Sequence, residues 1–248
     1  MLRFFRQLRQ QLLTENRFSK YLLYALGEIL LVVIGILLAL QIDNWNEEQK
    51  DRRTELGIIK NLKEEFQVNL LELDGVLEGL NTTKEANVQL MGFFGKPVDE
   101  LNLINIDSVM YLSVEFQRFI PAQNALTDLL QSGRLQLITN ESLKNLLYDW
   151  SRILSQADES YSGIDQKLEV DILPFLTPLY PLKDIDMYGP LEWKYPSRLP
   201  NNKLEVFAQI EYESIVDDML YRLVRHEKDL EKARTILIDI LGIIENQK

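Results

Sequence analysis

Near the start of the chain, the residues from Tyr21 to Ile42 are apolar except for Glu28 and Gln41. A helix of these 22 residues is ~33 Å long, which is enough to cross the ~30 Å hydrocarbon layer of a bilayer. The run therefore predicts a single transmembrane helix over residues 21–42, and the remainder of the chain is organised around it.

After this run the apolar positions become periodic and alternate with charged ones. One set recurs every seven residues, namely Ile59, Phe66, Leu73 and Leu80. A single apolar stripe of this kind predicts a long helix that buries one face. We expect the transmembrane helix to continue into it and to end near Phe94, before Lys96-Pro97. Gly75 and Gly79 weaken this helix locally and are candidate positions for a bend.

Shorter helices are expected between residues 98 and 133. Asp107 is a candidate N-cap for a helix over Ser108–Phe119. Pro121 suits the first turn of a further helix over Ala122–Ser132, which Gly133 would close.

A longer helix is predicted after Asn140, whose side chain can cap it. Its buried face consists of apolar residues at helical spacing, which are Leu143, Leu146, Leu147, Trp150 and Ile153. We expect this helix to run to about Leu173, with a kink or break near Gly163.

Residues 174–203 hold six of the eight prolines, together with several aromatic side chains. This composition predicts one long loop, and its aromatic residues indicate that it is ordered and folded onto the helices. Tyr180, Trp193 and Tyr195 are its candidate contacts for a ligand or a partner. The alternative is a structural lid that covers the end of the bundle.

A last helix is predicted after Pro200, with Asn202 and Glu205 as a candidate capping box. Its apolar stripe recurs every seven residues, at Val216, Leu223, Leu230, Leu237 and Ile244. Because this stripe matches that of the first long helix, we expect the two helices to pair in an antiparallel sense. The predicted fold is all-α: a single N-terminal transmembrane helix that continues into an antiparallel, extracytoplasmic helical bundle with one long Pro/aromatic loop.

Charge is divided unevenly along the chain. Residues 1–42 hold five basic and two acidic side chains, a charge of +3, which leaves −14 for the remainder of a chain whose net charge is −11. Residues 1–20 have the pattern of a basic amphipathic tail, and the positive-inside rule places such a tail in the cytoplasm. The acidic domain, residues 43–248, then lies across the membrane and repels phosphate backbones, so nucleic acid is not an expected partner. A cleaved signal peptide is the alternative, but no A-x-A-like site follows the run.

Small residues and one acid interrupt the transmembrane run on a common face. Gly27, Glu28, Gly35 and Ala39 form this face, because residues seven apart lie nearly two helical turns apart. A carboxyl group within hydrocarbon is costly and usually faces another helix or water. The face therefore predicts helix packing in a homo-oligomer or with a membrane-protein partner. The alternative is that Glu28 reaches back to the lipid headgroups.

Candidate chemistry is sparse. The chain has no cysteine and one histidine, so thiolate chemistry and histidine-rich metal sites are not expected. His226 lies on the apolar side of the last helix and is interpreted as a packed or hydrogen-bonded side chain. The segment Asp184–Gly189 is only a partial match to a calcium loop, since it lacks the later glutamate. No nucleophile elbow, phosphate-binding loop or catalytic triad is recognisable, so we expect neither an enzyme nor a cofactor.

The stretch Gly27–Glu47, GEILLVVIGILLALQIDNWNE, resembles the opening of a family of Gram-negative bacterial membrane proteins, domain of unknown function 6090. The leader FFRQLRQQLL and the segment Ala125–Ile138, ALTDLLQSGRLQLI, are similar to that family as well. The resemblance implies a single-pass protein of the bacterial inner membrane with a periplasmic domain. It implies no activity.

Two functions are compatible with these patterns. The first is a non-enzymatic, membrane-anchored envelope protein that acts through protein–protein contacts, as a scaffold or an accessory subunit. The alternative is an extracytoplasmic sensory or ligand-binding bundle that signals through a membrane partner. The size and polarity of any cavity beneath the loop at residues 174–203 would distinguish them.

Overall fold

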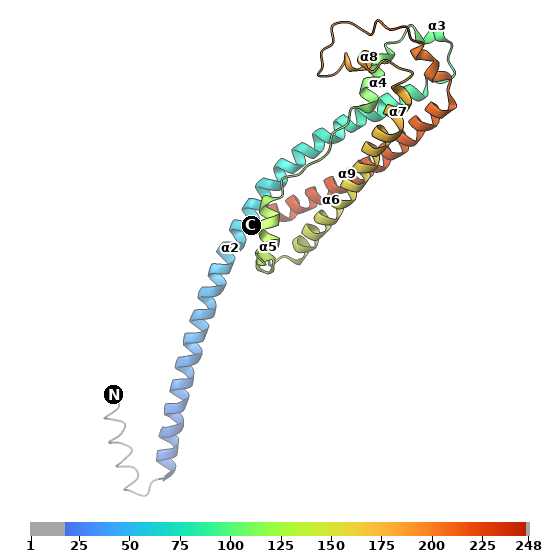
Figure 1. The fold of residues 1–248 in the computed structure, drawn as a ribbon. Helices are drawn as coiled ribbons and strands as arrows, with labels where there is room; N and C mark the ends of the chain where they lie inside the picture. The colour runs from blue at the N-terminus through green and yellow to red at the C-terminus, as the bar shows by residue number, and fades with distance from the viewer. Residues whose placement is uncertain (1–17, 247–248) are drawn as a thin grey trace. The chain divides into compact units, whose positions relative to one another are not determined.

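Helices make up the regular structure of the residues that the computed structural model describes, 18–246, and no strand occurs among them (Figure 1). The prediction of an all-α fold is confirmed. By its internal contacts the chain divides into two units, Met1–Gly57 and Ile58–Lys248. Helix α2 (Phe18–Met91) contributes to both.

The first unit contains the apolar run. Helix α2 starts at Phe18 and contains all of the predicted span at residues 21–42, whereas residues 1–17 of the predicted basic tail lie outside the described residues. Its apolar side chains are exposed, as Leu23 at 75% and Leu31 at 74% illustrate. Among the described residues, α2 is the one helix that is long and apolar enough to cross a membrane, with a mean hydropathy of 2.6 over its most apolar window. This property is compatible with a single-pass anchor, and signal sequences share it.

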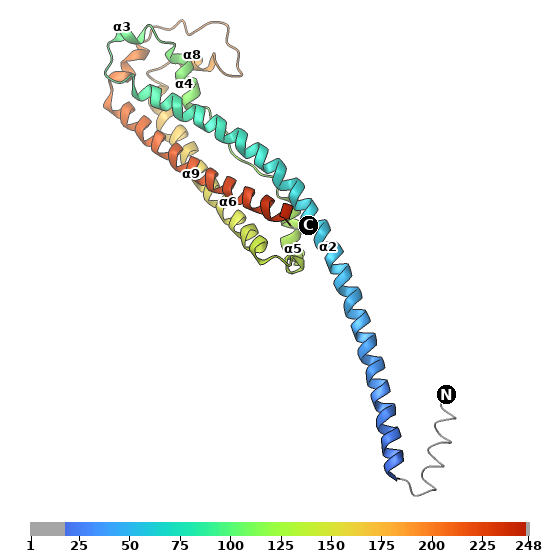
Figure 2. The same cartoon turned by 180° about the vertical axis from the view of Figure 1, so that it is seen from behind.

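In the second unit, the later part of α2 lies beside α6 (Glu141–Lys167) and α9 (Ile210–Asn246) (Figures 1 and 2). Three ion pairs join α2 to α9: Lys63–Glu245 at 3.0 Å, Asp74–Arg234 at 2.6 Å and Lys84–Glu227 at 2.5 Å. Residue numbers thus rise along α2 as their partners' numbers fall along α9. The same order holds between α6 and α9, where Gln156 reaches Asp229 at 2.7 Å and the Gly163 carbonyl accepts from Arg222 at 3.2 Å.

The core follows the seven-residue periodicity of the sequence. The predicted stripe positions of both long helices are buried, and so is the α6 face apart from the half-buried Leu146. Trp150 is fully buried in the core, where its ring makes edge contacts with Phe66 at 5.7 Å and with Phe119 at 6.3 Å between centroids. The α2 helix continues through Gly75 and Gly79 without interruption.

An extended segment, residues 115–123, which we call the strap, runs beside α2 (Figure 2). It separates α4 (Ile106–Val114) from α5 (Asn124–Gln131), so the helix predicted to Phe119 ends five residues earlier and the next one begins two residues later than predicted. The reason lies in α2, whose polar side chains bind the backbone of this segment. Asn69 donates to the Ala122 carbonyl and accepts from the Ala122 N–H, both at 2.8 Å.

Further side chains of α2 hold the backbone on either side of the strap's centre. Thr83 donates to the Glu115 carbonyl, and Asn87 donates to the Ser113 carbonyl at 2.8 Å. The Glu65 carboxylate accepts from the backbone N–H groups that open α5. These bonds satisfy backbone groups that a continued helix would otherwise pair, so the strap remains extended.

One of these three predicted helix termini differs from the structure, and two agree. Asn105, not Asp107, caps α4, by accepting from the Ser108 N–H at 3.4 Å. Asn140 caps α6 as predicted, by accepting from the Leu143 N–H at 3.0 Å. Gly133 closes α5 in the left-handed region at φ 69°, also as predicted.

The break predicted near Gly163 occurs later in the chain. Helix α6 is regular through Gly163 and gives way to a π turn at Leu168–Ile172, followed by α7 (Leu173–Leu176). Pro174 explains this position, since proline has no N–H to donate to the preceding turn and its ring crowds the carbonyl four residues earlier.

The predicted loop at 174–203 is partly helical. It contains most of α7 and all of α8 (Leu182–Asp186), and a 3₁₀ helix at Lys203–Ala208 precedes α9. The capping box predicted at Asn202 and Glu205 is wrong, because the Asn202 amide donates to the Glu205 side chain at 3.1 Å and α9 begins only at Ile210. The remaining short elements are α3 (Val98–Leu101) and a 3₁₀ turn at Arg134–Leu137.

Candidate functional site

The three aromatic residues proposed as loop contacts occupy two different environments. Tyr180 is buried, with 2% of its surface exposed, and its hydroxyl donates to Asp107 at 2.6 Å. Trp193 and Tyr195 are exposed at 46% and 66%. The structure therefore places Tyr180 in the core and leaves only the other two rings accessible to a partner.

Lys203 joins the loop to α4 through a compact charged cluster. Its ammonium lies 2.8 Å from both carboxylate oxygens of Asp107 and 3.0 Å from Asp184. Asp184 also accepts from the Ser197 N–H at 2.6 Å, and the ammonium lies 5.3 Å from the centre of the Tyr180 ring. This cluster ties the loop to α4, and it pairs the Asp184 carboxylate with an ammonium group.

Electrostatics in this cluster follow from burial and the two carboxylates. Burial, reinforced by the hydrogen bond to Asp107, raises the pKa of Tyr180. For Lys203, burial opposes the charge, but the hydrogen bonds to Asp107 and Asp184 outweigh it and raise the pKa of the ammonium. Both groups keep their protons at neutral pH, so the cluster acts as a structural tie.

The small-residue face of the apolar run is open. Gly27, Glu28, Gly35 and Ala39 all lie on the exposed part of α2. At Gly27 and Gly35, a side-chain methyl group would meet no atom within 4 Å. The packing face predicted from the sequence is therefore accessible along α2.

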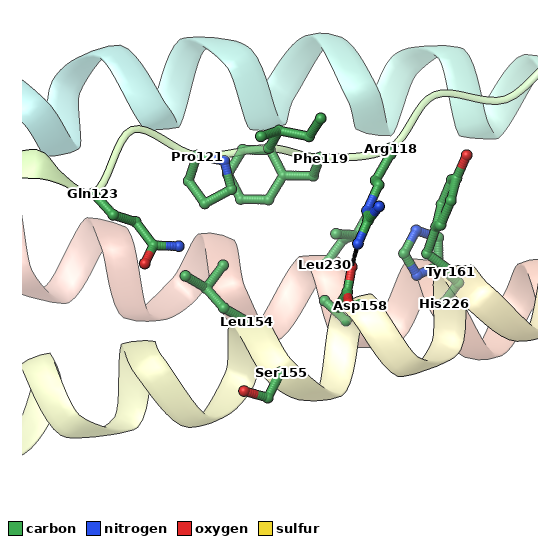
Figure 3. A pocket seen from close by; sticks show the side chains of 12 residues that line it. Arg118, Phe119, Pro121, Gln123, Leu154, Ser155, Asp158, Tyr161, His226 and Leu230 are labelled. Atoms are coloured by element: carbon green, nitrogen blue, oxygen red, sulfur yellow. Dashed lines mark hydrogen bonds and ion pairs between the residues drawn. The ribbon is translucent and has the colours of Figure 1, made fainter. Parts of the chain in front are cut away.

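A cavity of about 440 Å³ lies between the strap, α6 and α9 (Figure 3). It is not beneath the Pro/aromatic loop, where the sequence suggested a search. Its walls are mainly apolar, with one ion pair and one histidine, and the residues that line it are Arg118, Phe119, Ile120, Pro121, Gln123, Leu154, Ser155, Ala157, Asp158, Tyr161, His226 and Leu230.

His226 is the most buried polar group of this cavity, with 2% of its surface exposed. Its Nδ1 lies 2.8 Å from the Ser160 hydroxyl, which also lies 3.0 Å from the Ala157 carbonyl. A hydroxyl has one proton, and a carbonyl can only accept. When the Ser160 proton is directed to the Ala157 carbonyl, Ser160 accepts the Nδ1 proton of His226 and Nε2 carries a lone pair. No described residue donates to this buried Nε2.

Burial keeps the imidazole neutral. It lowers the pKa of His226 to about 4, against the opposing influence of the nearby Asp229 carboxylate. The sequence-based interpretation of His226 as a packed, hydrogen-bonded side chain agrees with this environment. Sequence reasoning did not anticipate that the second ring nitrogen would have no protein partner.

The strap contributes Arg118 to the cavity wall. Its guanidinium pairs with Asp158, with Nε at 2.9 Å from the carboxylate, and lies 5.6 Å from the centre of the Tyr161 ring. The Tyr161 ring in turn meets the His226 ring edge-on at 6.0 Å between centroids. Burial raises the pKa of Tyr161, with Asp165 adding to the effect and Arg118 opposing it. Four side chains thus form one continuous wall, which Figure 3 shows from the side of the cavity.

Sequence reasoning missed this cavity because its three walls come from segments that are far apart in the chain. Arg118 and Asp158 are 40 residues apart, and Ser160 and His226 are 66 apart. A lone histidine on an apolar stripe and an arginine beside aromatic residues were the only signals available. Neither indicates a cavity without knowledge of the strap.

The fold and the exposed apolar run together define the class of protein. It is an all-α protein with a helical domain and, among the described residues, one helix compatible with a membrane anchor. Residues 28–149 match the model of a family of unknown function, DUF6090. The resemblance inferred from the sequence is thereby confirmed. No curated protein and no solved structure matches the chain.

Proposed function

We propose that the protein is a non-enzymatic, membrane-anchored envelope protein that acts through protein–protein contacts, as a scaffold or an accessory subunit. In this proposal residues 21–42 cross the bacterial inner membrane, the N-terminus lies in the cytoplasm, and an antiparallel helical bundle lies in the periplasm. The observation that carries the proposal is the open face of Gly27, Glu28, Gly35 and Ala39 on an α2 segment whose apolar side chains are exposed.

Small residues favour close approach of two helices within lipid, where dispersion contacts and interhelical hydrogen bonds drive association. A glutamate in such a segment is stabilised when it faces a partner helix instead of hydrocarbon. Both features occupy one face of α2, so a second copy of this helix or another membrane helix fits there.

Site-specific photo-crosslinking in intact membranes tests this contact. A photoreactive residue at Ala39 is expected to give a crosslinked product, whereas one at Leu37, on the opposite face, is expected to give little. A product of twice the chain's mass identifies a homo-oligomer, and any other mass identifies a partner protein. Equal yields from the two positions would contradict a specific packing face.

Substitutions provide the matched comparison. Glu28→Leu and Gly35→Leu remove the polar group and the small-residue notch, and each is expected to reduce the Ala39 crosslink at least about five-fold, a coupling of about 1 kcal/mol. Val33→Phe adds comparable bulk on the opposite face and is expected to leave the crosslink unchanged. Unchanged crosslinking in both face variants would sink the proposal.

Topology can be measured separately, because the chain has no cysteine. Single cysteines at Gln10 and at Ser162 give one label each. A membrane-impermeant maleimide applied to the periplasmic side is expected to label only the Ser162→Cys variant. Labelling of Gln10→Cys alone would reverse the proposed orientation.

A second candidate function is a ligand-binding bundle that signals through a membrane partner. One observation favours it, namely the cavity beside His226, whose volume falls in the range of small-molecule sites, about 300–1,000 Å³. Its test is whether a bound ligand changes the yield of the Ala39 crosslink.

A further inference from the structure

We propose that the cavity between the strap, α6 and α9 binds a small, neutral, largely aromatic or apolar molecule that carries a hydroxyl or N–H donor, with His226 Nε2 as the acceptor. This inference rests on the second candidate function, because it names the ligand class of that site. It is supported by the geometry of the buried His226 ring and by the chemistry of the residues that line the cavity.

The hydrogen-bonding requirement comes from His226. With the Ser160 proton directed to the Ala157 carbonyl at 3.0 Å, Ser160 takes the Nδ1 proton of His226. In this arrangement Nε2 is an acceptor, and no described residue donates to it. A buried acceptor without a donor is destabilising, and a ligand donor placed there removes that cost. A ligand that can only accept hydrogen bonds gains nothing from this nitrogen.

The requirement for a neutral ligand comes from the charges of the wall. Arg118 is the cationic group in the lining, and Asp158 already neutralises it through its carboxylate. Burial keeps the imidazole uncharged. An anionic ligand would have to displace Asp158 from Arg118, and a cationic one would meet no unpaired carboxylate in the lining.

The requirement for an apolar body comes from the remaining walls. Phe119, Leu154 and Leu230 present hydrocarbon to the cavity, and Tyr161 adds a ring that Arg118 holds in place (Figure 3). Flat aromatic molecules bury much of their surface against such walls at little cost in conformational freedom. Phenol, which combines one ring and one hydroxyl donor, is the simplest probe with all the required features.

The strap makes the cavity dependent on α2. Arg118, Phe119 and Pro121 belong to the strap, and Asn69 of α2 fixes it through both backbone groups of Ala122. A ligand that fills the cavity packs against the strap and thereby against the helix that continues toward the apolar run.

Nuclear magnetic resonance of the full chain, with histidine labelled by ¹⁵N, tests the site directly, because His226 is the only histidine. The free protein is expected to show a neutral ring with the proton on Nδ1. Phenol is expected to shift the Nε2 resonance in the direction of hydrogen-bond acceptance. Anisole has the same ring and oxygen but no donor, and we expect it to bind at least about ten-fold more weakly and to leave Nε2 unshifted.

A variant pair shows whether the cavity is the binding site. Ser155→Trp places an indole at the cavity rim from an exposed position and is expected to weaken phenol binding at least about ten-fold. Ser162→Trp is the matched control, since Ser162 is also exposed on α6, makes the same bond to the carbonyl four residues earlier, and lies outside the lining. We expect it to change the affinity less than about two-fold.

Three results would overturn the inference: a proton on Nε2 in the free protein, equal responses to phenol and anisole, or full phenol binding by Ser155→Trp. Each of these concerns the cavity and leaves the crosslinking test of α2 unaffected. Conversely, a phenol-induced Nε2 shift with an unchanged Ala39 crosslink would support the site and reject the signalling function.

Discussion

The Ser160 hydroxyl lies 2.8 Å from Nδ1 of His226 and joins α6 to α9 at a point where both side chains are buried. This contact holds the ring of the only histidine in the chain against α6. Protonation of His226 is therefore one identifiable way in which acid would destabilise the bundle. A second proton on the ring would enter a site with no described hydrogen-bond acceptor at Nε2.

We expect His226 to make the folded domain less stable as the pH falls from about 6.5 towards 4. The pKa of His226 is about 4 when folded and 6.5 when unfolded, so between these values the unfolded chain binds a proton that the folded chain does not. The contribution of His226 to the free energy of unfolding is complete above pH 6.5. It is lower by about 1 kcal/mol at pH 5.5, and by about 3 kcal/mol once the pH has fallen below the folded pKa.

Urea unfolding at pH 7.5 and 5.5 measures this effect against His226→Gln, which does not titrate. Carboxylates contribute equally to both proteins. The change in the free energy of unfolding between the two pH values therefore differs between wild type and variant only by the contribution of the histidine. Identical pH dependence in wild type and variant would mean that the ring is not held neutral.

Asn69 is expected to be the main attachment of the strap. Asn69→Ala removes two hydrogen bonds to Ala122, and we expect it to lower the free energy of unfolding by about 2 kcal/mol. Asn81→Ala is the matched control, because Asn81 is exposed on the same helix and bonds only to Glu85, and it should cost less than about 0.5 kcal/mol. Hydrogen exchange of the Ala122 amide should accelerate only in the Asn69 variant; equal costs for the two variants would contradict this role.

Lys203 is expected to hold the Pro/aromatic loop against α4. Lys203→Met leaves Asp107 and Asp184 without their shared cation, and we expect it to destabilise the domain by about 2 kcal/mol at pH 7. Limited proteolysis should cut the loop faster in this variant than in Lys194→Met, which removes an exposed lysine of the same loop. Equal rates of cutting in the two variants would argue against this role of the cluster.

Two glycines are expected to respond to alanine in opposite directions. At Gly189 a Cβ would lie 2.7 Å from Cε2 of Tyr111, so Gly189→Ala should destabilise the loop by about 1–2 kcal/mol. At Gly75, in the exposed interior of α2, a Cβ would meet no atom within 4 Å. Gly75→Ala should therefore stabilise the domain by up to about 1 kcal/mol through its higher helix propensity. Thermal unfolding of the two variants checks the signs.

The long helices were predictable because their evidence is local. Seven-residue spacing placed the stripe positions of α2 and α9 correctly, and Asn140 identified the start of α6. The strap was not predictable, because Asn69 and Asn87 look like ordinary surface positions between stripe residues. These two side chains are buried only because the strap is extended, and not helical, where it packs against α2.

The position of Tyr180 shows the same limit for the candidate site. In sequence it is one more aromatic residue among prolines, equivalent to Trp193 and Tyr195. Its burial depends on Asp107, which is 73 residues away, and on Lys203, which pairs with the same carboxylate. Sequence periodicity carries no information about contacts of this range, so the loop was recognised while the roles of its residues were not.

The pairing of α2 with α9 has a consequence for how the protein is made. Lys84 meets Glu227 across 143 residues of chain, and Asp74 meets Arg234 across 160. During synthesis the apolar stripe of α2 leaves the ribosome long before the helix that covers it. The nascent chain therefore spends that interval with an uncovered stripe, and a chaperone that shields exposed apolar helices during translation or export would raise the yield of folded protein.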